Sequence, residues 1–145
     1  MKHFFHKLLP SLIILSLFTI TSCGDSINSE LGKKLAGTNK IKLYFFDKES
    51  GTVKDSKMIV TISKQDDIKK IVESITDETP GQYKCRYSGH LEIFKDNDLL
   101  FNAEFNFEEE CRHYVFMYNK RMLFKVMSEE GSALLKDYYS KAEGN

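Results

Sequence analysis

The sequence has no excess of charge of either sign, because 21 Lys and Arg residues balance 21 Asp and Glu residues. A basic stripe is the usual electrostatic sign of nucleic-acid binding, so this balance argues against DNA or RNA as a partner. Histidine and cysteine are also scarce, with four and three residues. Nucleophile elbow, P-loop and dinucleotide-binding motifs are all missing. We therefore expect neither an enzymatic activity nor a cofactor, and a hydrolase of unrecognised type is the alternative.

The chain has no apolar run long enough to cross a bilayer. Its longest apolar stretch covers residues 8–20, and these 13 residues fall short of the roughly 20 that a transmembrane helix needs. Lys2 and Lys7 precede this stretch, and the small residues Thr21 and Ser22 follow it. A charged start, a short apolar core and small residues at its end are typical of a secretory signal. We expect residues 1–22 to be a signal peptide.

The end of this signal resembles the lipobox of bacterial lipoprotein precursors, in which an aliphatic residue and two small residues precede an invariant cysteine. Here these positions are Ile20, Thr21, Ser22 and Cys23, and Ile is less usual than Leu at the first of them. The resemblance covers residues 1–23 alone. It implies cleavage after Ser22 and attachment of a diacylglycerol to the Cys23 thiol, often with acylation of the new amino group. The alternatives are an ordinary signal peptide with a coincidental cysteine and an uncleaved anchor.

The same resemblance implies a location in the cell envelope. A cysteine thiolate is the nucleophile that can carry a thioether-linked lipid, and two or three acyl chains give a stable membrane anchor. In enteric lipoproteins an Asp after the cysteine retains the protein in the inner membrane. Gly24 follows Cys23 here, so the resemblance favours the outer membrane where the host has one.

The remainder of the chain suits a single domain. Without residues 1–22, 123 residues are left, with 19 basic and 21 acidic side chains. This length is enough for one hydrophobic core and not for two. Residues 24–39 are polar and show no sustained apolar period, which predicts a flexible tether with a reach of roughly 20–25 Å. We expect the lipidated Cys23 and tether to span residues 23–39, and one domain to span residues 40–145.

Apolar periodicity predicts the class of this domain as α+β. Alternating apolar residues indicate strands at 41–46, 58–62, 89–95, 99–107, 111–118 and 122–126. Ser63 is a candidate N-cap for a helix with Ile68, Ile71, Val72 and Ile75 on one side, and Ser128 is one for a closing helix. The predicted order is ββ-α-ββββ-α, an antiparallel sheet of about six strands with the helices packed on one face.

Cys85 and Cys111 remain once Cys23 is assigned to the lipid. An even number of cysteines in an exported chain predicts a disulfide, which would stabilise the domain by roughly 3–4 kcal/mol in the chain-entropy account. A disulfide needs Cα atoms within about 7 Å. Cys85 must therefore lie in a lead-in segment that crosses the end of the 99–107 strand, outside the ladder. Two unpaired thiols are the alternative.

His90 and His113 are the only histidines outside the signal. Together with Cys85 and Cys111 they offer four potential zinc ligands. Neither the Cys85–His90 spacing nor the Cys111–His113 spacing matches a common zinc module, so this set is a weak candidate. It supports the alternative hypothesis of a small-ligand or metal-binding envelope lipoprotein.

The strand 111–118 is apolar on both faces. Tyr114, Phe116 and Tyr118 share one face, and Tyr83 and Tyr87, in the lead-in segment before the 89–95 strand, would extend this strip. We predict that these aromatic side chains lie on an open face of the sheet, where they would favour a protein partner. The alternative is that a helix or loop covers both faces. The leading hypothesis is a non-catalytic, lipid-anchored module that binds an envelope protein.

Overall fold

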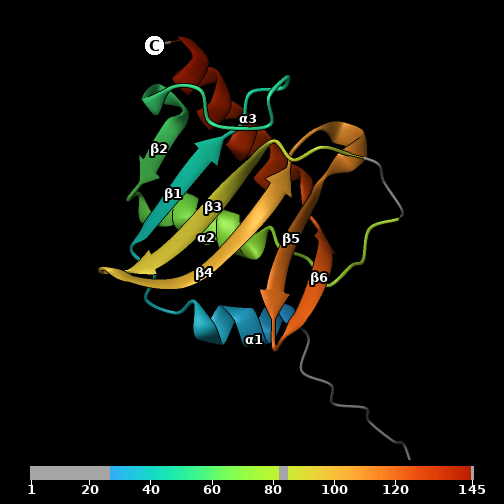
Figure 1. Ribbon diagram of the computed structural model, residues 1–145. Coiled ribbons are helices and arrows are strands. Elements are labelled where there is room, and N and C mark those ends of the chain that lie inside the picture. The colour runs from blue at the N-terminus through green and yellow to red at the C-terminus, as the bar shows by residue number, and fades with distance from the viewer. Residues whose placement is uncertain (1–26, 82–84, 145) are drawn as a thin grey trace, which may run out of the picture.

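The computed structural model describes residues 27–81 and 85–144 of the chain (Figure 1). Within them it has an antiparallel six-stranded sheet and α-helices, which confirms the α+β class. The expected signal peptide, Cys23 and Tyr83 lie outside the described residues. The elements are α1 (Ile27–Lys34), β1 (Lys40–Phe45), η1 (Ser56–Met58), β2 (Ile59–Ile62), α2 (Gln65–Glu73), β3 (Gly89–Lys95), β4 (Asp98–Asn106), η2 (Glu109–Cys111), β5 (His113–Tyr118), β6 (Arg121–Val126) and α3 (Glu129–Gly144).

The strands lie in the order β2-β1-β3-β4-β5-β6, and each neighbouring pair is antiparallel. Helix α2 carries the chain from β2 past β1 to β3, and β3 to β6 then follow one another as a meander. The β5–β6 turn consists of Asn119 and Lys120, which have φ values of 49° and 63°. Two central residues with positive φ define a type I′ turn, whose twist matches that of the paired strands.

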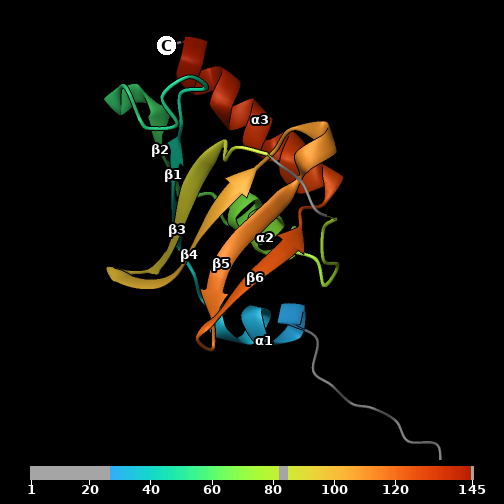
Figure 2. The ribbon, with the colours of Figure 1, turned by 45° about the vertical axis from the view of Figure 1, so that its right-hand side comes forward.

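The hydrophobic core lies between one face of the sheet and the helices. Alternate strand residues such as Ile41, Leu43 and Phe45 are fully buried on this face. Ile71 of α2 and Leu135 of α3 are fully buried against them. Figure 2 shows α2 and α3 together behind the sheet, while no helix of the described residues covers the opposite face.

Helix α1 is an element that the sequence prediction lacked, because it occupies part of the expected tether. Leu31 and Leu35 are buried in the core, and the Thr38 hydroxyl donates a 2.7 Å hydrogen bond to the Leu35 carbonyl beyond the helix end. In Figure 1 α1 lies across the lower end of the sheet, below α2, and therefore does not share the face that α2 and α3 cover. Residues 27–39 thus belong to the folded domain, although the prediction had assigned them to the tether.

The N-termini of α2 and α3 differ in their capping, and one hydrogen bond joins the two helices. Ser128 caps α3 as expected, since its hydroxyl accepts a 3.2 Å hydrogen bond from the Gly131 N–H. Ser63 does not cap α2, because Lys64 takes the N-cap position without a side-chain hydrogen bond. The Tyr138 hydroxyl of α3 donates a 2.7 Å hydrogen bond to the Asp67 carboxylate of α2.

Candidate functional site

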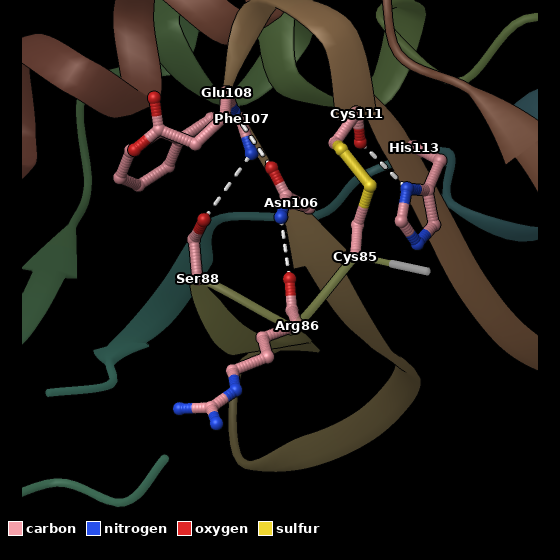
Figure 3. Close-up of a disulfide and its surroundings, with 8 residues drawn as sticks. All are labelled: Cys85, Arg86, Ser88, Asn106, Phe107, Glu108, Cys111 and His113. Atoms are coloured by element: carbon pink, nitrogen blue, oxygen red, sulfur yellow. Dashed lines mark hydrogen bonds between the residues drawn. A yellow bond between two sulfur atoms is a disulfide. The ribbon is translucent and has the colours of Figure 1, made fainter. Parts of the chain in front are cut away.

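A disulfide joins Cys85 to Cys111, as the sequence predicted, with their Cα atoms 6.1 Å apart. Cys85 lies in the segment before β3, and Cys111 is the last residue of η2. Neither residue belongs to a strand, which satisfies the geometric condition set by the strand order. Figure 3 shows the disulfide crossing the end of β4 to join the two segments.

Asn106, at the end of β4, also holds the segment before β3 against the residues that precede η2. Its buried amide donates a hydrogen bond to the Arg86 carbonyl and accepts one of 2.7 Å from the Glu108 N–H (Figure 3). Ser88 adds a second backbone link, since its N–H donates a 2.8 Å hydrogen bond to the Phe105 carbonyl. The segment 85–88 is therefore held to β4 and η2 by one covalent bond and several hydrogen bonds.

A cleft of about 430 Å³ lies between this braced segment and the turn that follows β1. Tyr87 stands at its side with 40% of its surface exposed. The Arg86 guanidinium closes one end by donating a 3.1 Å hydrogen bond to the Lys48 carbonyl. The other lining residues come from the turn, from the segment before β3, from the end of β4 and the residues up to η2, and from α3: Phe46, Asp47, Gly51, Cys85, Ser88, Asn106, Glu108, Cys111 and Tyr139.

The rim of the cleft carries charges of both signs. Lys48 lies 3.6 Å from Glu108 across it, and Asp47 lies 2.8 Å from Lys54. The hydrogen bond from Lys54 and that from the Ser50 N–H lower the pKa of Asp47 to about 2. Asp47 is therefore ionised at neutral pH and holds the turn that forms one wall of the cleft.

Tyr87 separates this cleft from a second hollow of about 350 Å³, which Pro80, His113 and Phe124 line on the other side. The ring centroids of Tyr87 and His113 are 6.1 Å apart. Of the residues singled out in the sequence, the structure thus brings Cys85, Tyr87, Cys111 and His113 to one corner of the domain.

The predicted aromatic strip on β5 does not lie on an open face, so this expectation is wrong for Tyr114, Phe116 and Tyr118. Tyr114 and Phe116 are buried beneath the helices, with 0% and 3% of their surfaces exposed. The Tyr114 hydroxyl lies 2.7 Å from the Ser74 hydroxyl, and burial raises the pKa of this phenol. Tyr118 points to the same side and donates a 2.8 Å hydrogen bond to Glu30 of α1. These three residues hold the core and α1 in place.

Three other apolar side chains take the open face of the β5–β6 hairpin. Met117, Met122 and Phe124 expose 57%, 60% and 44% of their surfaces. Met117 pairs directly with Met122 across the hairpin, and Val115 pairs with Phe124, so all three project to the same side. The sequence prediction had placed the opposite face of β5, with Tyr114 and Phe116, toward the solvent.

The histidines do not form the four-ligand set with the cysteines. Both sulfur atoms are used in the disulfide, and β4 lies between the strands of His90 and His113. His113 directs Nδ1 to the Cys111 carbonyl at 2.6 Å, and a carbonyl can only accept, so this nitrogen carries the hydrogen. His90 Nδ1 lies 3.2 Å from Glu104 Oε1 on the open face. No group of three or more possible metal ligands occurs among residues 27–81 and 85–144.

Sequence reasoning named the 85–111 pair but missed Asp47, Arg86 and Asn106. The turn signal of residues 47–52, with an Asp at its start and Gly51 within it, could have located one wall of the cleft. Asn106 carried no such signal, because its role depends on how the chain returns after β4.

No helix in the described part of the chain is long and apolar enough to cross a membrane. Comparisons with protein families, curated protein sequences and solved structures found no match to this chain.

Proposed function

We propose that this protein is a non-catalytic, lipid-anchored lipoprotein of the cell envelope, whose cleft beside the Cys85–Cys111 disulfide binds a segment of a partner protein. The lipobox resemblance of residues 20–23 supports the anchor at Cys23, and Gly24 favours the outer membrane where the host has one. Because the anchor acts through lipid, no residue of the folded domain needs to enter the bilayer core.

The main support for a binding role is the cleft beside the disulfide, together with the residues that line it. Tyr and Arg are enriched at the centres of protein interfaces, and Tyr87 and Arg86 lie side by side along this cleft. Its rim offers Lys48, Glu108 and Asp47, so it can pair with charged and uncharged groups of a polypeptide. A disulfide and the Asn106 hydrogen bonds fix one wall in advance, which lowers the entropy lost on binding.

The position of the cleft also favours a binding role. It lies at the end of the sheet where β1 ends and β3 begins, whereas α1, which follows the anchor in the chain, lies at the opposite end (Figure 1). A partner can therefore approach the cleft from the side away from the membrane.

Photo-crosslinking in intact cells tests this function. A photoreactive amino acid at Lys48, whose side chain is 77% exposed at the cleft, should give a discrete protein adduct. The matched control is Lys69 on α2, whose side chain is 72% exposed. Replacement of Tyr87 by Ala should abolish the Lys48 adduct while leaving the disulfide intact. Equal adducts from Lys48 and Lys69, or none at Lys48, would contradict the proposal.

The second candidate function is the binding of a small molecule in the same cleft. Its volume of about 430 Å³ falls within the range of roughly 300–1,000 Å³ typical of ligand pockets. Native mass spectrometry of the protein purified from its own cells separates the two candidates. A bound small mass that is lost on the Tyr87→Ala change would favour the ligand.

A further inference from the structure

The start of α1 is fixed against the β5–β6 turn. The Tyr118 hydroxyl bonds to Glu30, and the Lys34 ammonium lies 5.7 Å from the centre of the Tyr118 ring. Ile27 and Arg121 line a common hollow between the helix and the turn. Both views of the ribbon show α1 beside this turn, at the lower end of the sheet (Figures 1 and 2). Ile27 therefore marks the point on the domain from which the chain leads back to Cys23.

The covalent distance from that point to the anchor is short. Cys23 lies only four residues before Ile27, and four residues span at most about 14 Å when fully extended. A tether over residues 24–39 would have let the domain move well away from the bilayer. With α1 folded, the lipid on Cys23 must sit close to the β5–β6 turn.

This end of the domain has the surface chemistry of a membrane-facing region. Met117 and Met122 expose more than half of their surfaces beside the turn. Lys120 and Arg121 are exposed at the turn itself. Apolar side chains flanked by cations suit the boundary between acyl chains and anionic headgroups.

We propose that the β5–β6 turn and the start of α1 rest on the bilayer, with Met122 and Met117 entering the headgroup region and Lys120 and Arg121 contacting lipid phosphates. This inference rests on the lipid anchor of the proposed function. A protein partner does not fit the same position, because even a 100-residue domain has a radius of gyration of about 13 Å. Such a domain is wider than the space that four residues of chain leave.

Single tryptophans can measure this contact, because the sequence contains no Trp. The lipidated full-length mature protein would be placed in vesicles of phosphatidylcholine and phosphatidylglycerol carrying brominated acyl chains, which quench nearby Trp emission. The variants are Met122→Trp beside the turn, Phe124→Trp on the same strand and face, and Tyr87→Trp at the cleft. Position 124 lies about 7 Å farther along the strand than position 122.

We expect Met122→Trp to show blue-shifted emission and strong quenching, Phe124→Trp to show weaker quenching, and Tyr87→Trp to show none. Replacement of Lys120 and Arg121 by Gln should reduce the quenching of Met122→Trp, with a roughly five-fold loss of affinity for the anionic surface per charge. Quenching that does not change with this double replacement would overturn the phosphate contacts.

The outcomes separate this inference from the function on which it rests. A mass spectrum without lipid on Cys23 would overturn both. A lipidated Met122→Trp protein that is quenched no more than Tyr87→Trp would overturn the membrane-facing surface alone. Shielding of the same Trp in native envelopes, without quenching in vesicles, would assign this end to a protein partner and also overturn the inference.

Discussion

Asn106 shows how one polar side chain can fix two loops at once. Its amide has a carbonyl acceptor on one side, at Arg86, and an N–H donor on the other, at Glu108. A carboxylate could not donate to Arg86, and a hydroxyl could not reach both groups. The position therefore selects an amide, although a strand residue of this type has no distinguishing mark in the sequence.

Replacement of Asn106 by Ala should lower the free energy of unfolding by about 1–3 kcal/mol, because it removes two partly buried hydrogen bonds to the backbone of Arg86 and Glu108. Urea unfolding monitored by circular dichroism measures the loss. Asn102→Ala is the matched control, since Asn102 is exposed on the same strand and should lose far less. Equal losses at the two positions would contradict the bracing role of Asn106.

Asp67 couples the stability of the domain to acid pH. The hydrogen bond from Tyr138 and, to a smaller extent, that from Lys64 keep its pKa below the ordinary value in spite of burial. A lowered pKa means that the folded state favours the ionised carboxylate. The resulting stabilisation is present above the unfolded pKa of about 3.9 and is lost as pH falls through the lower folded value.

The Asp67→Asn variant should therefore be less stable than the native protein at pH 7, and the difference should shrink below about pH 4. Urea unfolding at several pH values measures it. Tyr138→Phe removes the same hydrogen bond from the other side, so the effects of the two changes should not add. A difference between native and Asp67→Asn protein that stays constant at acid pH would contradict the assigned cause.

At the scale of elements, the sequence predicted which strand residues face the core where apolar and polar residues alternate. It failed where strand register decides which residues face the core. Strand 99–107 alternates clearly, and Phe101, Ala103 and Phe105 do face the core. A β-bulge between Ile93 and Phe94 turns Leu99 outward against that pattern. Strand β5 is apolar on both faces, so only its pairing of Tyr114 with Phe105 assigns the faces. That pairing depends on η2, whose geometry no periodicity reveals.

Helix α1 was missed for a related reason. Ile27, Leu31 and Leu35 recur every four residues, which is one side of a helix. Polar residues surround these three positions, and so sparse a stripe does not predict burial by itself. The helix is stabilised by its contact with α2 and with Tyr118, which lies far away in the chain.

The packing of α3 against the end of α2 gives a prediction at this scale. A Cβ atom added at Gly131 would collide with the side chain of Ser74, which is itself bonded to Tyr114. Gly131→Ala should therefore destabilise the domain by about 1–3 kcal/mol. Gly32→Ala is the control, because nothing lies within 4 Å of the added atom on α1. It should stabilise the domain by up to about 1 kcal/mol, and thermal unfolding should show opposite shifts.

At the scale of the whole molecule, the boundary of the domain is the main correction to the sequence prediction. A chain that begins at Ile27 should unfold cooperatively. A chain that begins at Lys40 should lose much of its stability, because it lacks the buried Leu31 and Leu35. Leu31→Ala in the longer chain should cost about 2–5 kcal/mol on its own. Calorimetry of the three proteins measures this, and equal melting of the two chain lengths would contradict a structural role for α1.

The cleft could be predicted only in part. The number of cysteines predicted the disulfide, and the predicted strand order required Cys85 to lie outside the hydrogen-bonded strands. The wall opposite, at Phe46 and Asp47, comes from a turn 38 residues earlier than Cys85. No local pattern connects these two segments, because they meet through the pairing of β1 with β3.

That pairing also determines how the protein would respond to a mechanical pull. With the lipid anchor and partner proposed above, tension from the lipid would reach β1 at Lys40 once α1 has yielded. Tension from a partner in the cleft would reach β3 at Gly89, at the other end of the pair. Antiparallel strands pulled apart at their two N-terminal ends slide along each other, so the hydrogen bonds of the pair resist together and do not open one by one. The disulfide encloses β3 and β4 in a covalent loop, which limits how far the chain can extend. In the proposed arrangement, the β1–β3 pair would therefore resist a load between the anchor and the cleft.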